Sequence, residues 1–337
     1  MSVLGDLQSR AADRPAHIAL SEGADPRVVE AAVAAVAARL GRITLVGDTE
    51  AIKAQLDAIG AAPSDALIIA DPATSPLTAQ VAHTYFELRR HKGVTEAAAQ
   101  SFARDPMVFA AMLVRIGHAD GTVGGAVATT SDTVRAALQV IGKAADAPLV
   151  SSFFLMVLPE DHPSGRRAMI FADCGLVIDP SAPELAAIAA QSAASCAALI
   201  AETSKVALLS FSTMGSAKHA AVTKVTEALT HLRAGHPNIA ADGELQFDAA
   251  FAGDVGASKA PGSDVAGQAN VMVFPSLDAG NIGYKIAQRV GGCVAIGPIL
   301  QGLAKPANDL SRGCTAQDVL HMIAVTVLQA ADLEEPK

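Results

Sequence analysis

Short apolar runs alternate with alanine-rich stretches from the start of this chain, and this alternation limits the possible folds more than any other feature. We expect strands at Ala16–Leu20, Ile43–Val46 and Ala66–Ala70, because each run is short, apolar and bounded by polar residues. Helices over residues 27–40 and from Thr49 onward would connect them. This strand–helix order favours a parallel sheet with helices on both faces.

A second α/β unit is predicted from Pro148 onward. Leu149–Val157 and Ala168–Phe171 flank a polar turn, which favours a hairpin. The elements expected after it are a helix over 183–202, a strand at Val206–Ser210, a helix over 217–234 and a strand at Val271–Phe274. From Thr315 onward the apolar spacing indicates an amphipathic helix.

Composition narrows the class of protein. Hydrophobic residues make up 51% of the 337 positions, which is enough for packed cores and disfavours disorder. The net charge of −9 disfavours a general nucleic-acid binder, although a local arginine cluster can still hold a small anion. The four cysteines form no C-x-x-C pair, so we expect free thiols in a reducing cytosol. We find neither a secretory signal nor an unbroken apolar run of membrane-spanning length, so we expect a cytoplasmic protein.

Several common catalytic signatures are missing from the sequence. It has no P-loop, no G-x-G-x-x-G after the first strand, no G-x-S-x-G and no H-E-x-x-H. The nine histidines are not spaced like metal ligands, so no metal site is expected.

Polar residues follow the predicted strand at Ala119–Val127. A helix is expected to begin near Thr133, so Thr130, Ser131 and Arg135 would lie beyond a strand end and beside a helix N-terminus. Ligands of open α/β sheets gather at such positions, and an anion could bind there.

The segment that most strongly indicates chemistry is Gly297-Pro-Ile-Leu-Gln-Gly-Leu-Ala-Lys-Pro-Ala-Asn-Asp-Leu-Ser-Arg-Gly-Cys314, expected as an irregular loop that leads into a helix. Ser311 offers a hydroxyl and Arg312 a bidentate guanidinium, which together favour a phosphate or oxyanion cradle. The alternative is structural. Thr315 and Asp318 have the spacing of a capping box, and from spacing alone that interpretation of Asp318 is the stronger one.

The same segment closely resembles the C-terminal signature of phosphate acetyltransferases, Gly-Pro-Ile-x-Gln-Gly-Leu-x-Lys-Pro-x-Asn-Asp-Leu-Ser-Arg-Gly. The resemblance covers nearly the whole chain. Further matching stretches are Glu87–Gly93, Thr129–Arg135, Ser210–Lys218, Asp242–Ala250, Ala257–Gly267 and Phe274–Lys285. Several long matches in order are far more specific than any one short motif.

The resemblance implies a fold similar to that of isocitrate and isopropylmalate dehydrogenases. Two α/β domains with mostly parallel sheets would flank an interdomain cleft that holds the active site. The first domain would comprise residues 1–146 plus 297–337, and the second residues 147–296. A homodimer is implied as well.

The implied activity is the reversible reaction acetyl-CoA + phosphate = acetyl phosphate + CoA, by direct attack in a ternary complex. CoA is a substrate in this scheme, and no cofactor or metal takes part. The resemblance implies three catalytic residues. The Ser311 hydroxyl would stabilise the tetrahedral centre or the leaving phosphate, Arg312 would orient the acyl phosphate, and Asp318 would act as the base. The implied CoA ligands are Arg89 and Arg135, and the implied phosphate or acyl-phosphate contacts are Thr130, Ser131, Tyr284 and Gln301.

Some alternatives stay open on sequence. Arg89 also fits a solvated basic run at a helix end. The helix N-terminus and Arg312 would both make Asp318 a weaker base. A phosphate butyryl- or propionyltransferase needs only a roomier acyl pocket. A non-catalytic acyl-phosphate- or CoA-binding regulatory module and an oxidoreductase of the same fold are the remaining rivals.

Overall fold

The computed structural model describes residues 2–334, which fold into two compact units. The first unit takes the chain up to Ala145 and again from Leu303 onward, and the second comprises Asp146–Gly302. We expected the first unit to resume at residue 297. It resumes at 303, because strand β10 (Val294–Gln301) pairs with β5 (Ser151–Val157) in the sheet of the second unit.

The first unit contains a five-stranded sheet in the order β11-β4-β1-β2-β3, and every pairing in it is parallel. Its strands are β1 (Ala16–Leu20), β2 (Gly41–Val46), β3 (Leu67–Ala70), β4 (Gly121–Gly124) and β11 (Ala307–Asp309). The parallel sheet is therefore confirmed. The expectation of an irregular loop over residues 297–314 is wrong, since β10 ends within this segment and β11 lies inside it.

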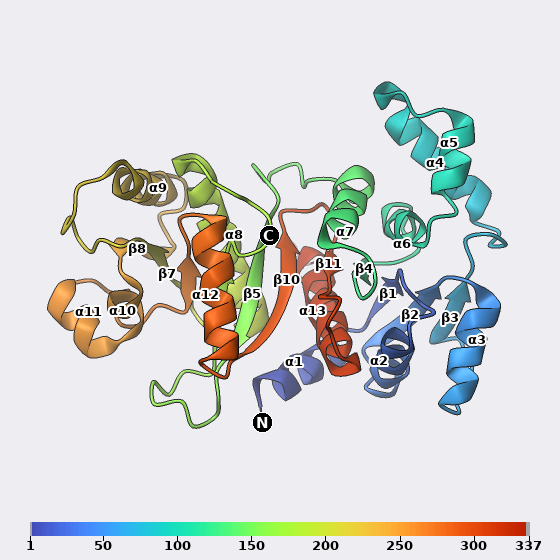
Figure 1. Cartoon of the computed structure of the whole chain (residues 1–337), viewed down its shortest axis with the longest axis horizontal. Coiled ribbons are helices and arrows are strands. Elements are labelled where there is room, and N and C mark those ends of the chain that lie inside the picture. Colours follow the sequence, from blue (N-terminus) through green and yellow to red (C-terminus); the bar gives the residue numbers. More distant parts are fainter. Residues whose placement is uncertain (1, 335–337) are drawn as a thin grey trace. The chain divides into compact units, whose positions relative to one another are not determined.

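The helices of the first unit are α1 (Val3–Ala12), α2 (Pro26–Ala37), α3 (Thr49–Ala58), α4 (Thr78–Arg89), α5 (Glu96–Phe102), α6 (Pro106–Arg115), α7 (Thr130–Ala136) and α13 (Ala316–Glu334), with a 3-10 turn at Arg90–Lys92 and a π turn at Ala137–Ile141. Helices α2, α3, α6, α7 and α13 pack against strands of this sheet, whereas α4 and α5 project away from it (Figure 1). Helix α7 begins at Thr130 and not near Thr133, because the Thr129 side chain caps it. Helices α1 and α13 come from opposite ends of the chain and pack together.

The second unit contains a six-stranded mixed sheet in the order β10-β5-β6-β9-β7-β8. Its strands are β5, β6 (Ala168–Ala172), β7 (Lys205–Leu209), β8 (Ala240–Leu245), β9 (Val271–Val273) and β10. The predicted hairpin is present as the antiparallel pair β5–β6, and β10 is also antiparallel to β5. The remaining pairings, β6–β9, β7–β9 and β7–β8, are parallel.

Five helices accompany this sheet: α8 (Ala182–Ile200), α9 (Ala220–Gly235), α10 (Phe247–Phe251), α11 (Gly253–Lys259) and α12 (Leu277–Arg289). Helix α8 is long and apolar enough to cross a membrane by length and composition alone. It packs against α9, β6 and β9, however, and buries residues such as Leu185 and Ile188. Its apolar character is thus explained by its place in the core of the second unit.

Candidate functional site

Three neighbouring strands of the first unit, β11, β4 and β1, end at the same edge of the sheet because they run parallel. Each is followed by a loop and a helix: β1 by α2, β4 by α7 and β11 by α13 (Figure 1). The predicted residues that follow β4 or β11 are Thr130, Ser131, Arg135, Ser311, Arg312 and Asp318. The sheet therefore gathers two predicted groups, far apart in sequence, at one edge.

Arg27, at the start of α2, ties the three loops together. Its guanidinium pairs with Asp25 at 2.8 Å and donates a 2.8 Å hydrogen bond to the carbonyl oxygen of Ala126, after β4. It also donates to the carbonyl oxygens of Arg312 at 2.8 Å and Cys314 at 3.1 Å, after β11. One side chain thus fixes the positions of all three loops relative to one another.

Glu22 joins the first two loops a second time. Its carboxylate accepts hydrogen bonds from three successive backbone N–H groups, those of Ala126 at 2.6 Å, Val127 at 2.9 Å and Ala128 at 2.7 Å. Successive amides of this kind form an anion-binding nest. Gly125 begins the turn with a φ of +98°, a conformation that side-chain-bearing residues rarely adopt. The loop after β4 is therefore held around a carboxylate.

Ser311 and Arg312 lie exposed on the loop after β11, where a ligand can reach them. The carboxylate of Asp318 is half-buried and accepts hydrogen bonds from the Thr315 backbone N–H at 2.8 Å and the Thr315 hydroxyl at 2.9 Å. The Asp318 N–H donates back to that hydroxyl at 3.2 Å. The predicted capping box is thus confirmed. The base role of Asp318 stays a prediction.

Thr130, Ser131 and Arg135 lie exposed on α7. The Arg135 guanidinium donates to the Ser131 hydroxyl at 3.2 Å and pairs with Asp132 at 2.8 Å. A hydrogen bond from the Thr129 hydroxyl, and then that from Arg135, lowers the pKa of the Asp132 carboxyl. Arg135 is therefore held in place on the exposed surface of the helix.

The Asp309 side chain, at the end of β11, is fully buried. Burial, and to a smaller extent the nearby Glu22 carboxylate, raises its pKa to about 6. The hydroxyls of Thr130 and Thr133 oppose that rise, although neither reaches a hydrogen bond of ordinary geometry with the carboxylate. A buried carboxyl with a pKa near neutrality beside exposed polar groups is typical of functional sites.

Sequence reasoning missed Asp309, Glu22 and Arg27. A signal was available for the latter two, because charged residues directly after a strand of a parallel sheet lie at its ligand-binding edge. Asp309 lies inside the signature segment, but its burial depends on pairing with β4, which the sequence pattern does not reveal.

The other predicted residues lie elsewhere in the first unit or belong to the second unit. Arg89 is the last residue of α4, which lies apart from α7 in Figure 1. Burial raises the pKa of the nearby Tyr85, and the charge of Arg89 opposes that rise. Tyr284 and Gln301 belong to the second unit. The Tyr284 ring stacks on Phe154 with centroids 3.9 Å apart.

Gln301 is buried in a polar network within the second unit. Its amide donates to the hydroxyls of Ser151 at 2.9 Å and Ser192 at 3.0 Å, and its oxygen accepts from the Ser195 hydroxyl at 3.0 Å. A ligand would have to compete with these bonds, so the assignment of Gln301 to substrate binding stays a prediction.

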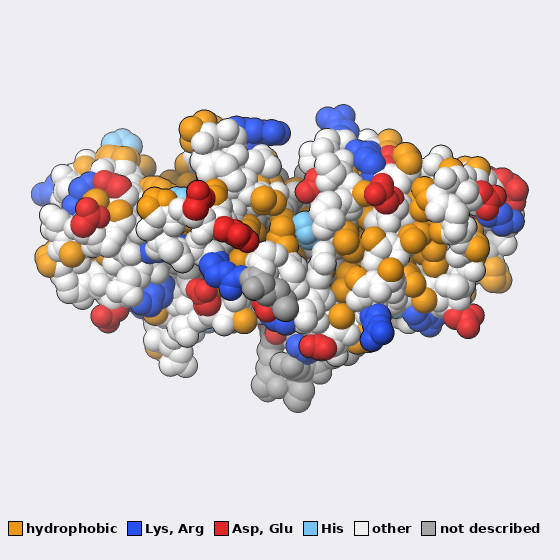
Figure 2. Space-filling view, turned by 90° about the horizontal axis from the view of Figure 1, so that it is seen from below, with side chains coloured by type: hydrophobic (Ala, Val, Ile, Leu, Met, Phe, Trp, Pro, Cys, Tyr) orange, Lys and Arg blue, Asp and Glu red, His pale blue; other side chains and the backbone are white. Residues whose placement is uncertain are grey.

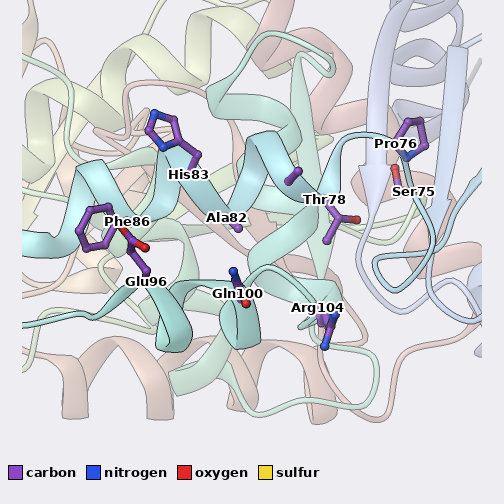
Figure 3. Close-up of a pocket in the computed structure, with 10 residues that line it drawn as sticks. Ser75, Pro76, Thr78, Ala82, His83, Phe86, Glu96, Gln100 and Arg104 are labelled. Carbon is purple, nitrogen blue, oxygen red and sulfur yellow. The ribbon is translucent and has the colours of Figure 1, made fainter.

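A hollow of about 600 Å³ lies between α4 and α5 (Figure 3). His83 comes from α4 and Glu96 and Gln100 from α5, with Arg104 just beyond that helix. None of the predicted site residues lines this hollow.

The described part of the chain contains neither a cluster of metal-ligating side chains nor a thiol with a lowered pKa. Residues 2–334 contain no group of three His, Cys, Asp or Glu side chains arranged to hold a metal. All four cysteines are free, and burial raises the pKa of the Cys314 thiol, which keeps it protonated.

Comparison with known proteins places these features in a family. Residues 2–327 match the family described as "Phosphate acetyl/butaryl transferase". The phosphate acetyltransferase of Paracoccus denitrificans is 53% identical over 95% of this chain and 96% of its own, and that of Clostridium acetobutylicum is 46% identical over 93% and 94%.

Solved structures agree with this comparison. A phosphotransacetylase from Streptococcus pyogenes superposes with a TM-score of 0.90 at 42% identity, covering 98% of both chains. A 4-hydroxythreonine-4-phosphate dehydrogenase from Klebsiella pneumoniae, at 11% identity and a TM-score of 0.52 over 94% of this chain and 98% of its own, shares the fold alone, which relates the fold to a dehydrogenase. The chain belongs to the phosphate acetyl/butaryl transferase family.

Proposed function

We propose that this protein is a phosphate acetyltransferase that catalyses acetyl-CoA + phosphate = acetyl phosphate + CoA in both directions. The observation that carries the proposal is the shared edge of the first unit's sheet. Thr130, Ser131 and Arg135 are exposed there on α7, and Ser311 and Arg312 are exposed on the loop after β11, which Arg27 links to the loop after β4. Hydroxyl and guanidinium groups on a rigid loop suit a phosphate and an oxyanion. Relatives up to 53% identical that bear this name support the assignment.

In the proposed mechanism both substrates are bound at once and the acetyl group passes directly between them. The CoA thiolate attacks the carbonyl carbon of acetyl phosphate, the C–O bond to phosphate breaks, and phosphate leaves. Arg312 orients the acyl phosphate and offsets its charge, and Ser311 donates to the developing oxyanion. One such donor is worth about 10²–10³ in kcat.

Asp318 is proposed to accept the proton of the CoA thiol. Its two hydrogen bonds from Thr315 favour the ionised carboxylate and so oppose strong basicity. They also fix its orientation at the first turn of α13, so positioning contributes much of its effect.

The proposed CoA ligands are Arg89 and Arg135. The Arg135 guanidinium is held by Ser131 and Asp132, which leaves its remaining donors for a phosphate. The Nε of Arg89 is buried without a hydrogen-bond partner within residues 2–334, a feature that favours a role for this side chain beyond the solvated surface. Thr130 and Ser131 are proposed to contact phosphate or acyl phosphate, and Tyr284 and Gln301 remain weaker proposals for the same ligand.

The second candidate is a phosphate butyryl- or propionyltransferase; the family description names butyryl transfer beside acetyl transfer. The names of the relatives favour acetyl. A non-catalytic binding module is disfavoured, because Ser311, Arg312 and Asp318 are all present. Comparing kcat/KM for acetyl-CoA and butyryl-CoA decides the acyl range, since one methylene is worth about 1–3 kcal/mol in a closed pocket.

A homodimer is proposed as the working form. Ile282 and Ile286 on α12 and Val290 directly after it follow one another at four-residue spacing, and they are 57%, 55% and 83% exposed. Such a stripe lies on one face of a helix, and an apolar face of this kind is typical of an interface. Two copies of α12 meeting about a two-fold axis would cover it.

We place the enzyme in the cytoplasm, with no metal, no cofactor besides its CoA substrate, and neither nucleic acid nor membrane as partner. The free cysteines fit a reducing compartment. On the face seen in Figure 2, acidic and basic side chains are interspersed, which does not favour nucleic acid. Full activity in the presence of EDTA would support the metal-free scheme.

One assay tests the proposed function directly. Acetyl phosphate and CoA are mixed with the protein, and thioester formation is followed by absorbance. We expect turnover by the wild-type protein and a large loss in Arg312→Ala. A wild-type protein without turnover would contradict the proposal.

A further inference from the structure

Asp309 has an unusual environment for an acidic side chain. It is 0% exposed, and neither carboxylate oxygen has a hydrogen-bond partner among the described residues. Asp173 in the second unit shows the ordinary arrangement. Its buried carboxylate accepts bonds from the N–H groups of Ser152, Gly175, Leu176 and Val177. A buried carboxylate without partners adds no stability, so its presence at Asp309 calls for another explanation.

The surroundings of Asp309 fix the direction in which its carboxylate can act. On one side lies the backbone of Gly125, where an added Cβ would stand 2.2 Å from Oδ1. Glu22, itself held by three amides, contributes a second negative charge. Arg27, a cation near these loops, is paired with Asp25. The other polar groups that act on the Asp309 carboxylate are the hydroxyls of Thr130 and Thr133, both on α7, and the backbone N–H of Leu310.

Of these two hydroxyls, only that of Thr130 belongs to an exposed residue. Thr133 is buried, and its hydroxyl lies 3.4 Å from the carbonyl oxygen of Thr129, to which it donates. The Thr130 hydroxyl therefore lies between the buried carboxylate and the exposed edge that carries Ser131 and Arg135. A proton can pass from a ligand at that edge to Asp309 through one intervening hydroxyl.

We propose that Asp309, acting through the Thr130 hydroxyl, is the proton acceptor on the phosphate side of the reaction. The inference rests on the proposed function. When a phosphate oxygen attacks acetyl-CoA, a C–O bond forms and the C–S bond breaks. The proton of the attacking phosphate moves to Thr130 Oγ1, whose own proton moves to the Asp309 carboxylate. The departing thiolate takes a proton from the Asp318 carboxyl, the group proposed as acceptor in the reverse direction; Asp309 then releases its proton to solvent and Asp318 regains one from solvent.

The chemistry of phosphate requires such an acceptor. Phosphate near neutral pH still holds a proton that the more acidic acetyl phosphate releases, so the proton has to leave as the new bond forms. The pKa of Asp309, about 6, lies close enough to neutrality for the carboxyl to take that proton and return it to solvent. Asp309 is a positioning residue in this scheme, because only Thr130 touches the ligand.

The test uses the full-length enzyme in the direction that consumes phosphate, with release of the CoA thiol as readout. For the wild-type protein we expect kcat/KM for phosphate to fall below about pH 6, where Asp309 becomes protonated. Asp309→Asn should lower kcat about 10²–10⁴-fold and remove this acidic limb, with the KM for acetyl-CoA unchanged. Thr130→Val should reproduce the loss, and Thr130→Ser, which restores the hydroxyl, should recover most of it.

Thr223→Val is the matched control, since Thr223 is an exposed helical threonine of the second unit whose hydroxyl bonds to the His219 carbonyl oxygen. It should behave like the wild-type protein. An Asp309→Asn enzyme with near wild-type kcat and an unchanged acidic limb would overturn the inference. If that variant fails to fold, equal activity of Thr130→Val and Thr130→Ser overturns it instead. Wild-type turnover separates this failure from failure of the proposed function.

Discussion

The Arg27 guanidinium donates a 2.8 Å hydrogen bond to the carbonyl oxygen of Arg312, a residue 285 positions further along the chain. Together with its bonds to Ala126 and Cys314, this contact holds the predicted acyl-phosphate loop against the first α/β elements. The exposed Arg312 side chain thus stands on a backbone whose position depends on another arginine.

Replacing Arg27 by Met should therefore loosen the site. We expect a loss of about 1–3 kcal/mol in stability, because several carbonyl groups lose a charged donor, and a lower kcat. Thermal unfolding and the thioester assay measure the two effects. Lys53→Met is the control, since Lys53 forms an exposed pair with Glu50 at 3.1 Å and its replacement should change stability by less than about 0.5 kcal/mol. Equal stability of the two variants would contradict the linking role of Arg27.

Asp309→Asn should make the protein more stable at alkaline pH. The folded-state pKa of about 6 lies above the ordinary value of 3.8, so the folded protein holds this proton more tightly than the unfolded chain. The stabilisation that the folded wild-type protein gains from the bound Asp309 proton is complete below the ordinary pKa of 3.8 and is lost as pH rises through about 6. At pH 8 the variant should gain up to about 3 kcal/mol, and at pH 4 the advantage should disappear.

Asp173→Asn is the contrasting variant for that experiment, because its carboxylate is fully hydrogen-bonded. It should lose about 1–3 kcal/mol at pH 8. Melting temperatures across pH 4–9 report both changes. An Asp309→Asn variant less stable than the wild-type protein at pH 8 would show that the carboxylate has partners that stabilise it.

Comparing the single variants Asp318→Asn and Thr315→Ala separates the helix-capping role of Asp318 from its proposed role as a base. Both changes break the capping box and should each cost about 1 kcal/mol. Only Asp318→Asn removes the carboxylate, so we expect kcat to fall about 10²–10⁴-fold in that variant and only slightly in Thr315→Ala. Similar kcat values for the two variants would mean that Asp318 acts only as a helix cap.

The arginines proposed to bind CoA should affect KM more than kcat. In Arg89→Gln and Arg135→Gln we expect the KM for CoA to rise at least tenfold, because a charged bond to phosphate is worth about 1.5–3 kcal/mol. Raising the salt concentration should weaken CoA binding by the wild-type enzyme more than by either variant. An unchanged KM in both variants would reject the assignment.

The exposed stripe of α12 should hold the dimer together. Ile286→Glu places a charge in the middle of the stripe, so we expect the dimer to dissociate. Size exclusion with light scattering should then report the mass of a monomer. Ile59→Glu, at an exposed position beyond α3, should leave the assembly unchanged. A variant at Ile286 that keeps the wild-type mass would place the interface elsewhere.

The fold could be predicted from the sequence where the burial of an element requires an apolar pattern in its own residues. The strands β1, β2 and β3 are short and mostly apolar because a parallel strand is covered on both faces, and the predicted bounds of each agree with the observed ones to within two residues. β11 was not predicted, since the three residues Ala-Asn-Asp carry no apolar pattern. They form a strand only because β4 supplies a partner.

The candidate site likewise contains residues that local sequence identifies and residues whose roles depend on distant parts of the chain. Thr130, Ser131 and Ser311 could be located from the sequence, because polar residues after strands mark the ligand edge of an α/β sheet. The capping box of Asp318 was visible as well, since its hydrogen bonds are local. The positions of Glu22 and Arg27 after β1 gave a signal for the ligand edge, but the contacts that they make, like the burial of Asp309, join loops far apart in sequence. Neither spacing nor composition records such contacts.

β11 and α13 are translated long after the other elements of the first unit, and this order affects how the protein folds during synthesis. The first 145 residues leave the ribosome well before the strand and helix that complete their sheet, and the whole second unit is made in between. Until then β4 is an open edge, exposed to pairing with other nascent chains. The loop after β11 can join the other two loops that Arg27 ties together only after residues 303–334 have been made, so the predicted active site is completed late in folding.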